Sequence, residues 1–218
     1  MKKINFNNSS EKVPIGKIVC VGRNYAEHVK EMDAEIGEFP LIFMKPASTL
    51  IFNGENIIHP DHSNEMHHEV ELVLLIGETI RNADDATAEK AIAGYAVGLD
   101  MTLRDLQREC KAKGIPWELA KSFDTCAVVS DFVSNSEYDF TGKENIILSV
   151  NNEIRQNSTL EHMLFNPVKI VKYLSSKFTL DKGDIIYTGT PEGVGKVNRG
   201  DIITASISGI GQLENEVI

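Results

Sequence analysis

The 218-residue sequence has no long apolar run and few cysteines. No stretch approaches the roughly 18 consecutive apolar residues of a membrane-spanning helix, so we predict a protein that does not enter a membrane. The cysteines, Cys20, Cys110 and Cys126, are widely spaced and match no metal-binding pattern. Free buried thiols are therefore expected, as is usual in a reducing compartment. The residues after the N-terminal lysines are too polar for a signal-peptide core, which predicts a cytoplasmic protein.

Positive charge is also scarce. The chain has 22 lysines and arginines against 32 aspartates and glutamates, which gives a net charge of −10. This balance argues against a nucleic-acid-binding surface, although a small basic pocket can still hold an anionic substrate. We find no repeat, linker or low-complexity segment. The length and the hydrophobic content of 42% predict one domain over 1–218, beginning with a short polar segment at 1–16 that has little to pack.

The stretch His67–Ile76 combines a buried strand with carboxylates. Its last seven residues are apolar except for Glu71, as in a strand buried on both faces. Glu69 and Glu71 stand two positions apart and therefore project to the same side of a strand. A third acid, Asp100, ends the apolar run 95–99. Buried carboxylates so close together would repel each other and take up protons unless a cation lay between them.

Three carboxylates with no cysteine beside them are typical ligands of a hard divalent cation such as Mg²⁺ or Mn²⁺. The residues alone leave two alternatives open. In one, the two glutamates line a solvated strand face and Asp100 opens a turn. In the other, His67 lies on the same face and completes a site of two glutamates and one histidine, which would admit Zn²⁺ or Fe²⁺. His68 is expected to point to the opposite face.

The hydrophobic patterns elsewhere predict a β-rich α+β domain. Asn24 and Thr102 each precede a predicted helix and have an acid three residues later, which is the spacing of a capping box. Asn151-Asn152 predicts a two-residue hairpin turn, because asparagine tolerates positive φ. The segment 31–39 is expected to be a loop that can move as a lid together with the helix before it. The predicted strands cover 17–22, 41–44, 146–150, 153–156, 184–187 and 202–207, and the predicted helices cover 25–32, 84–93, 103–113 and the residues from 167.

Three further motifs are candidates for catalysis or binding. His28 and Glu31 share a face of the first predicted helix, as a base with its orienting carboxylate or, as the spacing alone favours, as an ordinary solvated pair. Lys121 stands among apolar and aromatic residues, but lysines usually keep the ammonium group in solvent, and the same holds for Lys45. The loop Thr188–Gly195 is glycine-rich without the spacing of a phosphate-binding loop, which favours a simple turn.

Six short motifs occur in order along the chain and cover nearly everything from residue 17 onward. They are Gly22-Arg23-Asn24-Tyr25 with His28 and Glu31, Phe43-Met44-Lys45-Pro46, His68-Glu69-Val70-Glu71-Leu72, Leu99-Asp100-Met101-Thr102 with Arg104, Asp105 and Gln107, Trp117 with Ala120-Lys121-Ser122-Phe123, and Thr188 to Gly195. This ordered set resembles the fumarylacetoacetate hydrolase family. The resemblance implies a β-rich roll or barrel-like mixed sheet with short peripheral helices, assembled as a homodimer.

The resemblance also implies roles for individual side chains. These roles are metal binding, with Mg²⁺ or Mn²⁺ as the cofactor, catalysis on a segment that orders when ligand binds, and binding of a small 2-oxo acid. The residues are Glu69, Glu71 and Asp100 for the metal, His28, Glu31 and Lys121 for catalysis, and Arg104, Gln107 and Thr190 for the substrate.

Within the family, the chain resembles the compact branch that includes acylpyruvate hydrolases and oxaloacetate decarboxylases. The expected activity is metal-dependent cleavage of the C–C bond of an acylpyruvate, of the 3-acylpyruvate or fumarylpyruvate type, to pyruvate and a carboxylic acid. Oxaloacetate decarboxylation through the same pyruvate enolate is expected from the same site. An isomerase or decarboxylase of an unsaturated 2-oxo dioic acid in aromatic catabolism is the alternative. A metal-dependent nuclease, which the net charge disfavours, and a catalytically silent metal-stabilised dimer are the other hypotheses.

Overall fold

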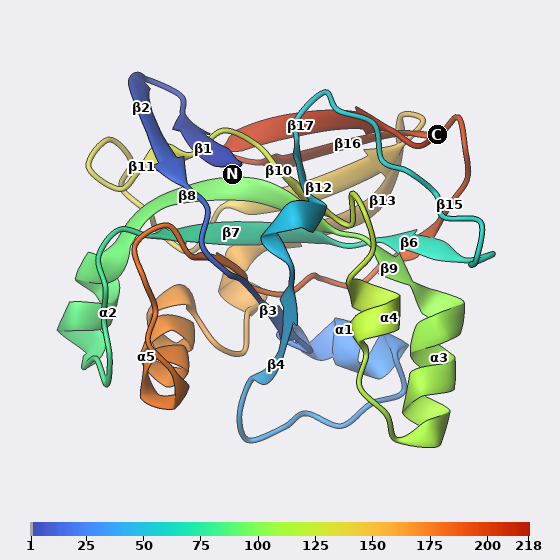
Figure 1. The fold of residues 1–218 in the computed structure, drawn as a ribbon, viewed down its shortest axis with the longest axis horizontal. Coiled ribbons are helices and arrows are strands. Elements are labelled where there is room, and N and C mark those ends of the chain that lie inside the picture. The colour runs from blue at the N-terminus through green and yellow to red at the C-terminus, as the bar shows by residue number, and fades with distance from the viewer. Residues whose placement is uncertain (1) are drawn as a thin grey trace.

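The computed structural model describes residues 2–218, with the backbone alone at 9–11, and is built around a mixed eight-stranded sheet (Figure 1). Two neighbouring pairs of this sheet, β14 with β3 and β10 with β5, are parallel, and the others are antiparallel. The strand order is β4 (Leu41–Lys45), β3 (Ile18–Gly22), β14 (Ile185–Tyr187), β7 (Val70–Ile76), β8 (Ile92–Asp100), β10 (Ala127–Val129) and β5 (Leu50–Phe52), with β11 (Val133–Ser134) paired to β8.

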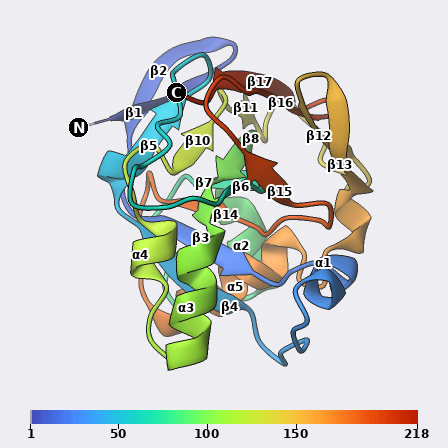
Figure 2. The same ribbon diagram turned by 90° about the vertical axis from the view of Figure 1, so that its right-hand side faces the viewer.

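Three smaller sheets complete the β structure. A four-stranded antiparallel sheet packs on β7 and β8, as Figure 2 shows from the side, and a three-stranded sheet contains β6, the strand directly before β7. The strands are β13 (Glu153–Thr159), β12 (Asn145–Val150), β16 (Ile202–Ile207) and β17 (Gly211–Glu216) in the first, β15 (Gly195–Val197), β6 (Met66–His68) and β9 (Thr102–Leu103) in the second, and β1 (Lys3–Phe6) with β2 (Ser9–Pro14) in the third. The fold is thus a β-rich α+β half-barrel, as predicted.

The helices are short and lie on one side of the central sheet in Figure 1. The last of them, α5, begins as the sequence predicts: the Asn166 side chain accepts a hydrogen bond from the backbone amide of Lys169, and Pro167 occupies the first turn. No helix within residues 2–218 has the length and hydrophobicity needed to cross a membrane. The helices are α1 (Ala26–Glu31), α2 (Asp85–Ala91), α3 (Arg104–Lys113), α4 (Glu118–Lys121) and α5 (Pro167–Lys177), with 3-10 turns at Ala47–Thr49 and Leu160–His162.

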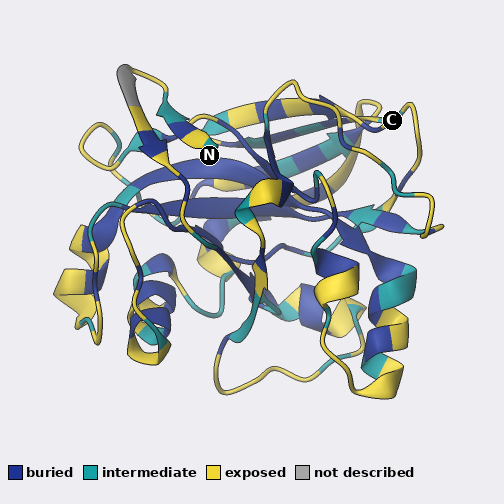
Figure 3. Cartoon of the chain, viewed as in Figure 1, coloured by how far each residue is buried: buried dark blue, intermediate teal, exposed yellow. Residues whose placement is uncertain are grey.

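All seven residues of β7 are buried, as the apolar pattern predicts, and the strand crosses the centre of the molecule (Figure 3). Successive side chains of β7 pack alternately into two hydrophobic clusters on its two faces. Leu72 and Leu74 join the larger cluster, between the central and four-stranded sheets, whereas Val73 and Leu75 join the smaller one on the other face. Because side chains alternate along a strand, Glu71 projects to the face of Val73. A carboxylate therefore lies on the same face of β7 as residues of the smaller hydrophobic cluster.

Both predicted capping boxes are wrong. The Asn24 side chain donates to the carbonyls of Phe165 and Thr188 over 2.9 and 2.7 Å and accepts from the Phe165 amide, so α1 begins only at Ala26. Thr102 lies in β9, where its hydroxyl accepts a hydrogen bond from Lys121 over 2.6 Å. In both places the polar side chain hydrogen-bonds to a residue far away in sequence, although local spacing predicts that it caps a helix.

The N-terminal segment packs more than the sequence suggested. β1 and β2 form a hairpin with Asn7-Asn8 in the turn, and Ile4, Val13 and Ile15 are buried in the smaller hydrophobic cluster. The prediction that residues 1–16 have little to pack is therefore wrong for the described residues. The hairpin predicted at Asn151-Asn152 is confirmed, since both residues have positive φ between β12 and β13.

Candidate metal centre and active site

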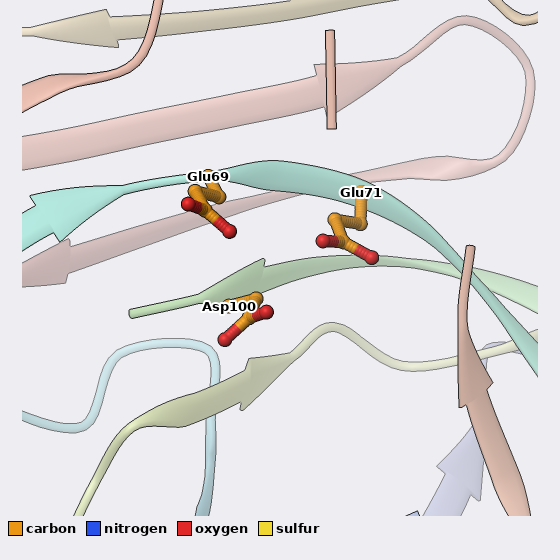
Figure 4. A group of neighbouring side chains, drawn as sticks. All are labelled: Glu69, Glu71 and Asp100. Atoms are coloured by element: carbon orange, nitrogen blue, oxygen red, sulfur yellow. The ribbon is translucent and has the colours of Figure 1, made fainter. Parts of the chain in front are cut away.

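The three carboxylates predicted as metal ligands lie together at the ends of β7 and β8 (Figure 4). The strands are antiparallel with Glu71 opposite Gly98, and the amide of Asp100 donates to the carbonyl of Glu69 over 2.9 Å. One oxygen from each carboxylate lies within 4.8 Å of the others. The residues are only 0–4% exposed, which rules out the solvated strand face left open by the sequence.

Two buried lysines and one arginine balance part of this negative charge. The Lys121 ammonium lies 2.7 Å from Glu69 and 2.7 Å from Asp100, and the Lys45 ammonium lies 2.7 Å from Asp100. Arg104 pairs with Glu69. Burial acts to lower the pKa of Lys121, but Asp100 and Glu69 outweigh it and raise that pKa. Both lysines are therefore buried cations, which settles the question that their sequence context left open.

Glu71 differs from the other two carboxylates. Among residues 2–218, no cationic side chain forms an ion pair with Glu71, and its carboxylate accepts a hydrogen bond of 2.6 Å from the amide of Gly189. Burial, together with Asp100 and Glu69, raises the pKa of Glu71 well above its ordinary value. The pKa of Glu69 is lowered, because Lys121 and Arg104 outweigh the effect of burial. A cation bound beside Glu71 would stabilise its charged form, and three carboxylate donors fit a hard divalent ion.

The two histidines beside the cluster turn away from it. His67 lies 3.2 Å from Glu65 and accepts a long hydrogen bond from Arg104, so the alternative site of two glutamates and one histidine is not formed. His68 points to the opposite face, as predicted, with its Nδ1 atom 3.1 Å from Gln156. Within the described chain the candidate metal cluster contains carboxylates alone.

His28 and Glu31 form a hydrogen-bonded pair at the edge of the same site. His28 Nδ1 lies 2.9 Å from one oxygen of Glu31, and the other oxygen accepts from the amide of Gly193 over 3.1 Å. Burial acts to raise the pKa of Glu31, but the bonds from His28 and Gly193 outweigh it and lower that pKa. His28 is only 6% exposed, so the interpretation as an ordinary solvated pair is wrong for the imidazole, whereas Glu31 is exposed. The geometry is that of an imidazole oriented by a carboxylate.

One pocket unites these groups. Eight of the nine predicted site residues line it, and the ninth, Glu31, is hydrogen-bonded to His28. The lining residues are Val21, Gly22, Arg23, His28, Met32, Phe43, Glu69, Glu71, Asp100, Arg104, Gln107, Lys111, Trp117, Lys121 and Thr190. Arg23 and Lys111 are lining cations that the sequence analysis assigned no role.

Gln156 is a positioning residue that the sequence did not reveal. Its side-chain oxygen accepts from the Val70 amide over 3.1 Å, and its nitrogen donates over 2.8 Å to both the Thr190 hydroxyl and the Pro191 carbonyl. The loop Thr188–Gly195 is therefore tied to the start of β7. It forms part of the wall of the site and is more than the simple turn that its composition favoured.

These features agree with comparison to known proteins. Residues 17–218 match the family described as "Fumarylacetoacetate (FAA) hydrolase C-terminal". The chain belongs to the fumarylacetoacetate hydrolase family. The resemblance drawn from the sequence motifs is thereby confirmed, and the chain is an enzyme of this family.

Relatives within the fumarylacetoacetate hydrolase family carry two kinds of name. Oxaloacetate tautomerase YcgM of Escherichia coli (strain K12) is 45% identical over 90% of this chain and 90% of its own length. The mitochondrial oxaloacetate tautomerase FAHD1 of Homo sapiens is 45% identical over 88% of this chain and 87% of its own. The crystal structure of fumarylpyruvate hydrolase from Pseudomonas aeruginosa, in complex with Mn²⁺ and pyruvate, is 36% identical, with a TM-score of 0.96 over 100% of this chain and 95% of that one.

Lowering the pH should reduce the free energy of unfolding of the metal-free protein, because His68 is protonated more readily in the unfolded chain. Burial lowers the pKa of this histidine to about 4, whereas the unfolded chain takes up the proton near pH 6.5. Neutral His68 therefore makes its full contribution to the free energy of unfolding above about pH 6.5, and that contribution is lost as the pH falls toward 4. Between pH 7 and pH 5 the free energy of unfolding should fall by about 2 kcal/mol. Urea unfolding at both pH values should give a smaller decline in stability for His68→Asn than for wild type. Equal declines would show that His68 does not titrate in this way.

Proposed function

We propose that this protein is a divalent-metal-dependent enzyme, acting as a homodimer, that interconverts the keto and enol forms of oxaloacetate. The observation that carries the proposal is the single pocket in which an oriented imidazole, His28, faces a buried carboxylate cluster. Keto–enol interconversion needs one group that moves a proton and one charge centre that stabilises an enolate. The 45% identity to two proteins named as oxaloacetate tautomerases supports this choice of substrate.

Tautomerisation moves one proton from the enol oxygen on C2 to C3, and no atom leaves the substrate. When bound by Glu69, Glu71 and Asp100, Mg²⁺ or Mn²⁺ would supply Lewis-acid stabilisation for the negative charge that develops on the C2 oxygen. The Lys121 ammonium, held in place by Glu69 and Asp100, stabilises the same charge from within the pocket. Because this ammonium is fixed before the reaction starts, it need not reorganise as the charge develops.

His28 exchanges the proton at C3. Its Nδ1 is engaged by Glu31, which leaves Nε2 as the nitrogen for proton exchange with the substrate. Glu31 stabilises the positively charged form of the ring while it carries the proton. Gln107 and Thr190 line the pocket and can orient the substrate carboxylate, whereas Arg104 is engaged with Glu69 and Gln107 and keeps both in position.

Acylpyruvate hydrolysis, the activity expected from the sequence, is the second candidate. The likeness to a fumarylpyruvate hydrolase crystallised with Mn²⁺ and pyruvate favours it. In that reaction His28 takes a proton from water, the hydroxyl adds to the distal acyl carbon, and the C–C bond breaks to a carboxylic acid and the enolate of pyruvate. His28 then returns the proton to that enolate. Oxaloacetate decarboxylation and isomerisation of an unsaturated 2-oxo dioic acid use the same enolate chemistry and stay predictions.

One set of assays separates these reactions. The protein is stripped of metal and supplied with Mg²⁺ or Mn²⁺, and the ultraviolet absorbance of enol-oxaloacetate is followed beside pyruvate release from oxaloacetate and from acetylpyruvate. We expect metal-dependent loss of the enol to be faster than either release of pyruvate. Faster pyruvate release from acetylpyruvate would make the protein a hydrolase, and enol decay at the uncatalysed rate would overturn the tautomerase proposal.

A further inference from the structure

Two cationic side chains that line the pocket, Arg23 and Lys111, form no ion pair with a carboxylate among the described residues. Lys45, Lys121 and Arg104 are each paired with Glu69 or Asp100 of the cluster, so their charges are offset. Arg23 and Lys111 are partly exposed, whereas the carboxylate cluster is buried. They therefore add positive charge near the opening of the pocket.

Helix α3 explains how Lys111 reaches this position. Arg104, Gln107 and Lys111 follow one another at helical spacing and all line the pocket. Arg104 contacts Glu69 at the inner end, and Lys111 lies seven residues later, about 10 Å along the helix axis. Lys111 packs over the ring of Trp117, with 5.7 Å between its ammonium and the ring centroid. The helix thus leads from the cluster toward the opening.

Arg23 approaches from another wall of the pocket. It follows β3 directly and has a φ of 61°, in the left-handed region that residues other than glycine rarely adopt. Such backbone conformations are held at functional sites by the surrounding structure. Burial, then Arg23 and Arg104, lower the pKa of Lys111, which means that these cations are close enough to repel one another. A bound anion would relieve that repulsion.

We propose that Arg23 and Lys111 form a subsite for the second carboxylate of a 2-oxo dicarboxylate, and thereby select such substrates over 2-oxo monocarboxylates. This inference rests on the proposed function, because the first carboxylate and the 2-oxo group are taken to lie at the inner cluster. The side walls favour the selection, since Phe43 and Trp117, with ring centroids 6.3 Å apart, line the pocket with apolar surface. A charge pair formed beside apolar groups is screened less than one in open water.

The single tryptophan of the chain, Trp117, lies in the pocket and reports binding by its fluorescence. Oxaloacetate, supplied as its equilibrium keto–enol mixture, is titrated by stopped flow against 2-oxobutyrate, which has a methyl group in place of the distal carboxylate. Both titrations use the Mg²⁺-loaded protein. Arg23→Gln and Lys111→Met should each reduce the preference for oxaloacetate about tenfold, the value of one charge-assisted contact. Lys113→Met is the matched control, because Lys113 is exposed on the same helix and pairs with Glu109.

The measured preferences test the subsite and the proposed function separately. A loss of oxaloacetate preference in both variants but not in Lys113→Met supports the subsite. An unchanged preference, or an equal loss for both ligands, overturns it. The proposed function fails separately: a protein that prefers oxaloacetate over 2-oxobutyrate but does not accelerate enol decay retains the subsite and loses the tautomerase assignment. A protein that accelerates enol decay without preferring oxaloacetate over 2-oxobutyrate retains the tautomerase assignment and loses the subsite.

Discussion

Glu71→Gln is expected to abolish turnover while leaving the metal-free protein at least as stable as wild type. Glu71 is the one carboxylate of the cluster that forms no ion pair among the described residues, and burial beside Asp100 and Glu69 makes its charge unfavourable there. A neutral amide of the same shape removes that repulsion and can still accept the hydrogen bond from Gly189. It is also a poorer ligand for a hard cation, so activity should fall on the order of 10³-fold.

Thermal unfolding with and without Mg²⁺ or Mn²⁺ separates the two effects. Wild type should gain stability from the ion, whereas Glu71→Gln should gain little. Asp100→Asn is the matched comparison: it removes a charge shared by Lys45 and Lys121, and leaving buried cations unpaired should cost about 3–5 kcal/mol even without metal. A wild-type metal-induced increase in the melting temperature of Glu71→Gln would refute the assignment of the cluster.

His28→Ala is expected to reduce turnover by about 10²- to 10⁴-fold, the usual value of a positioned general base. The metal-induced increase in melting temperature should persist, because His28 pairs with Glu31 and is not part of the carboxylate cluster. The measurement is steady-state enol decay beside thermal unfolding with added Mn²⁺. His62→Ala, at an exposed histidine outside the pocket, should keep wild-type activity.

The result would count against the proposed role in either of two ways. If His28→Ala turned over oxaloacetate at the wild-type rate, the proton would have to move through another group. If the variant also lost its response to Mn²⁺, the decline in activity would report the metal site and not proton transfer.

Sequence periodicity located the carboxylate cluster because strand geometry alone decides where those side chains point. Glu69 and Glu71 are neighbours along one strand, and Asp100 ends the strand beside it, so a period of two residues brings them together. His28 and Glu31 were accessible for the same reason, as neighbours on one helix. The helix spacing did not reveal the burial of His28, because burial depends on elements from the rest of the chain.

The errors concern side chains whose partners are far away in sequence. Asn24 satisfies every local requirement of a helix cap, yet it bonds to residues 141 and 164 positions away. Gln156 looks like an ordinary strand residue and has no local signal for its contact with Thr190, 34 positions later. Lys45 and Lys121 could equally have been solvated lysines until the tertiary fold placed Asp100 between them. Of these residues, only Lys121 was given a role in advance, by the motifs shared with a known family.

The order of strands in the central sheet has a consequence for the folding pathway. β7 and β8 follow each other in sequence and pair directly, so their acids meet early, as local pairings do. Lys45 lies on β4, which joins β7 only through β3 and β14, and β14 is made of residues 185–187. The nascent chain can therefore bring Glu71 and Asp100 together before β14, which joins β3 to β7, has been synthesised. A divalent cation bound between these acids at that stage would offset their mutual repulsion.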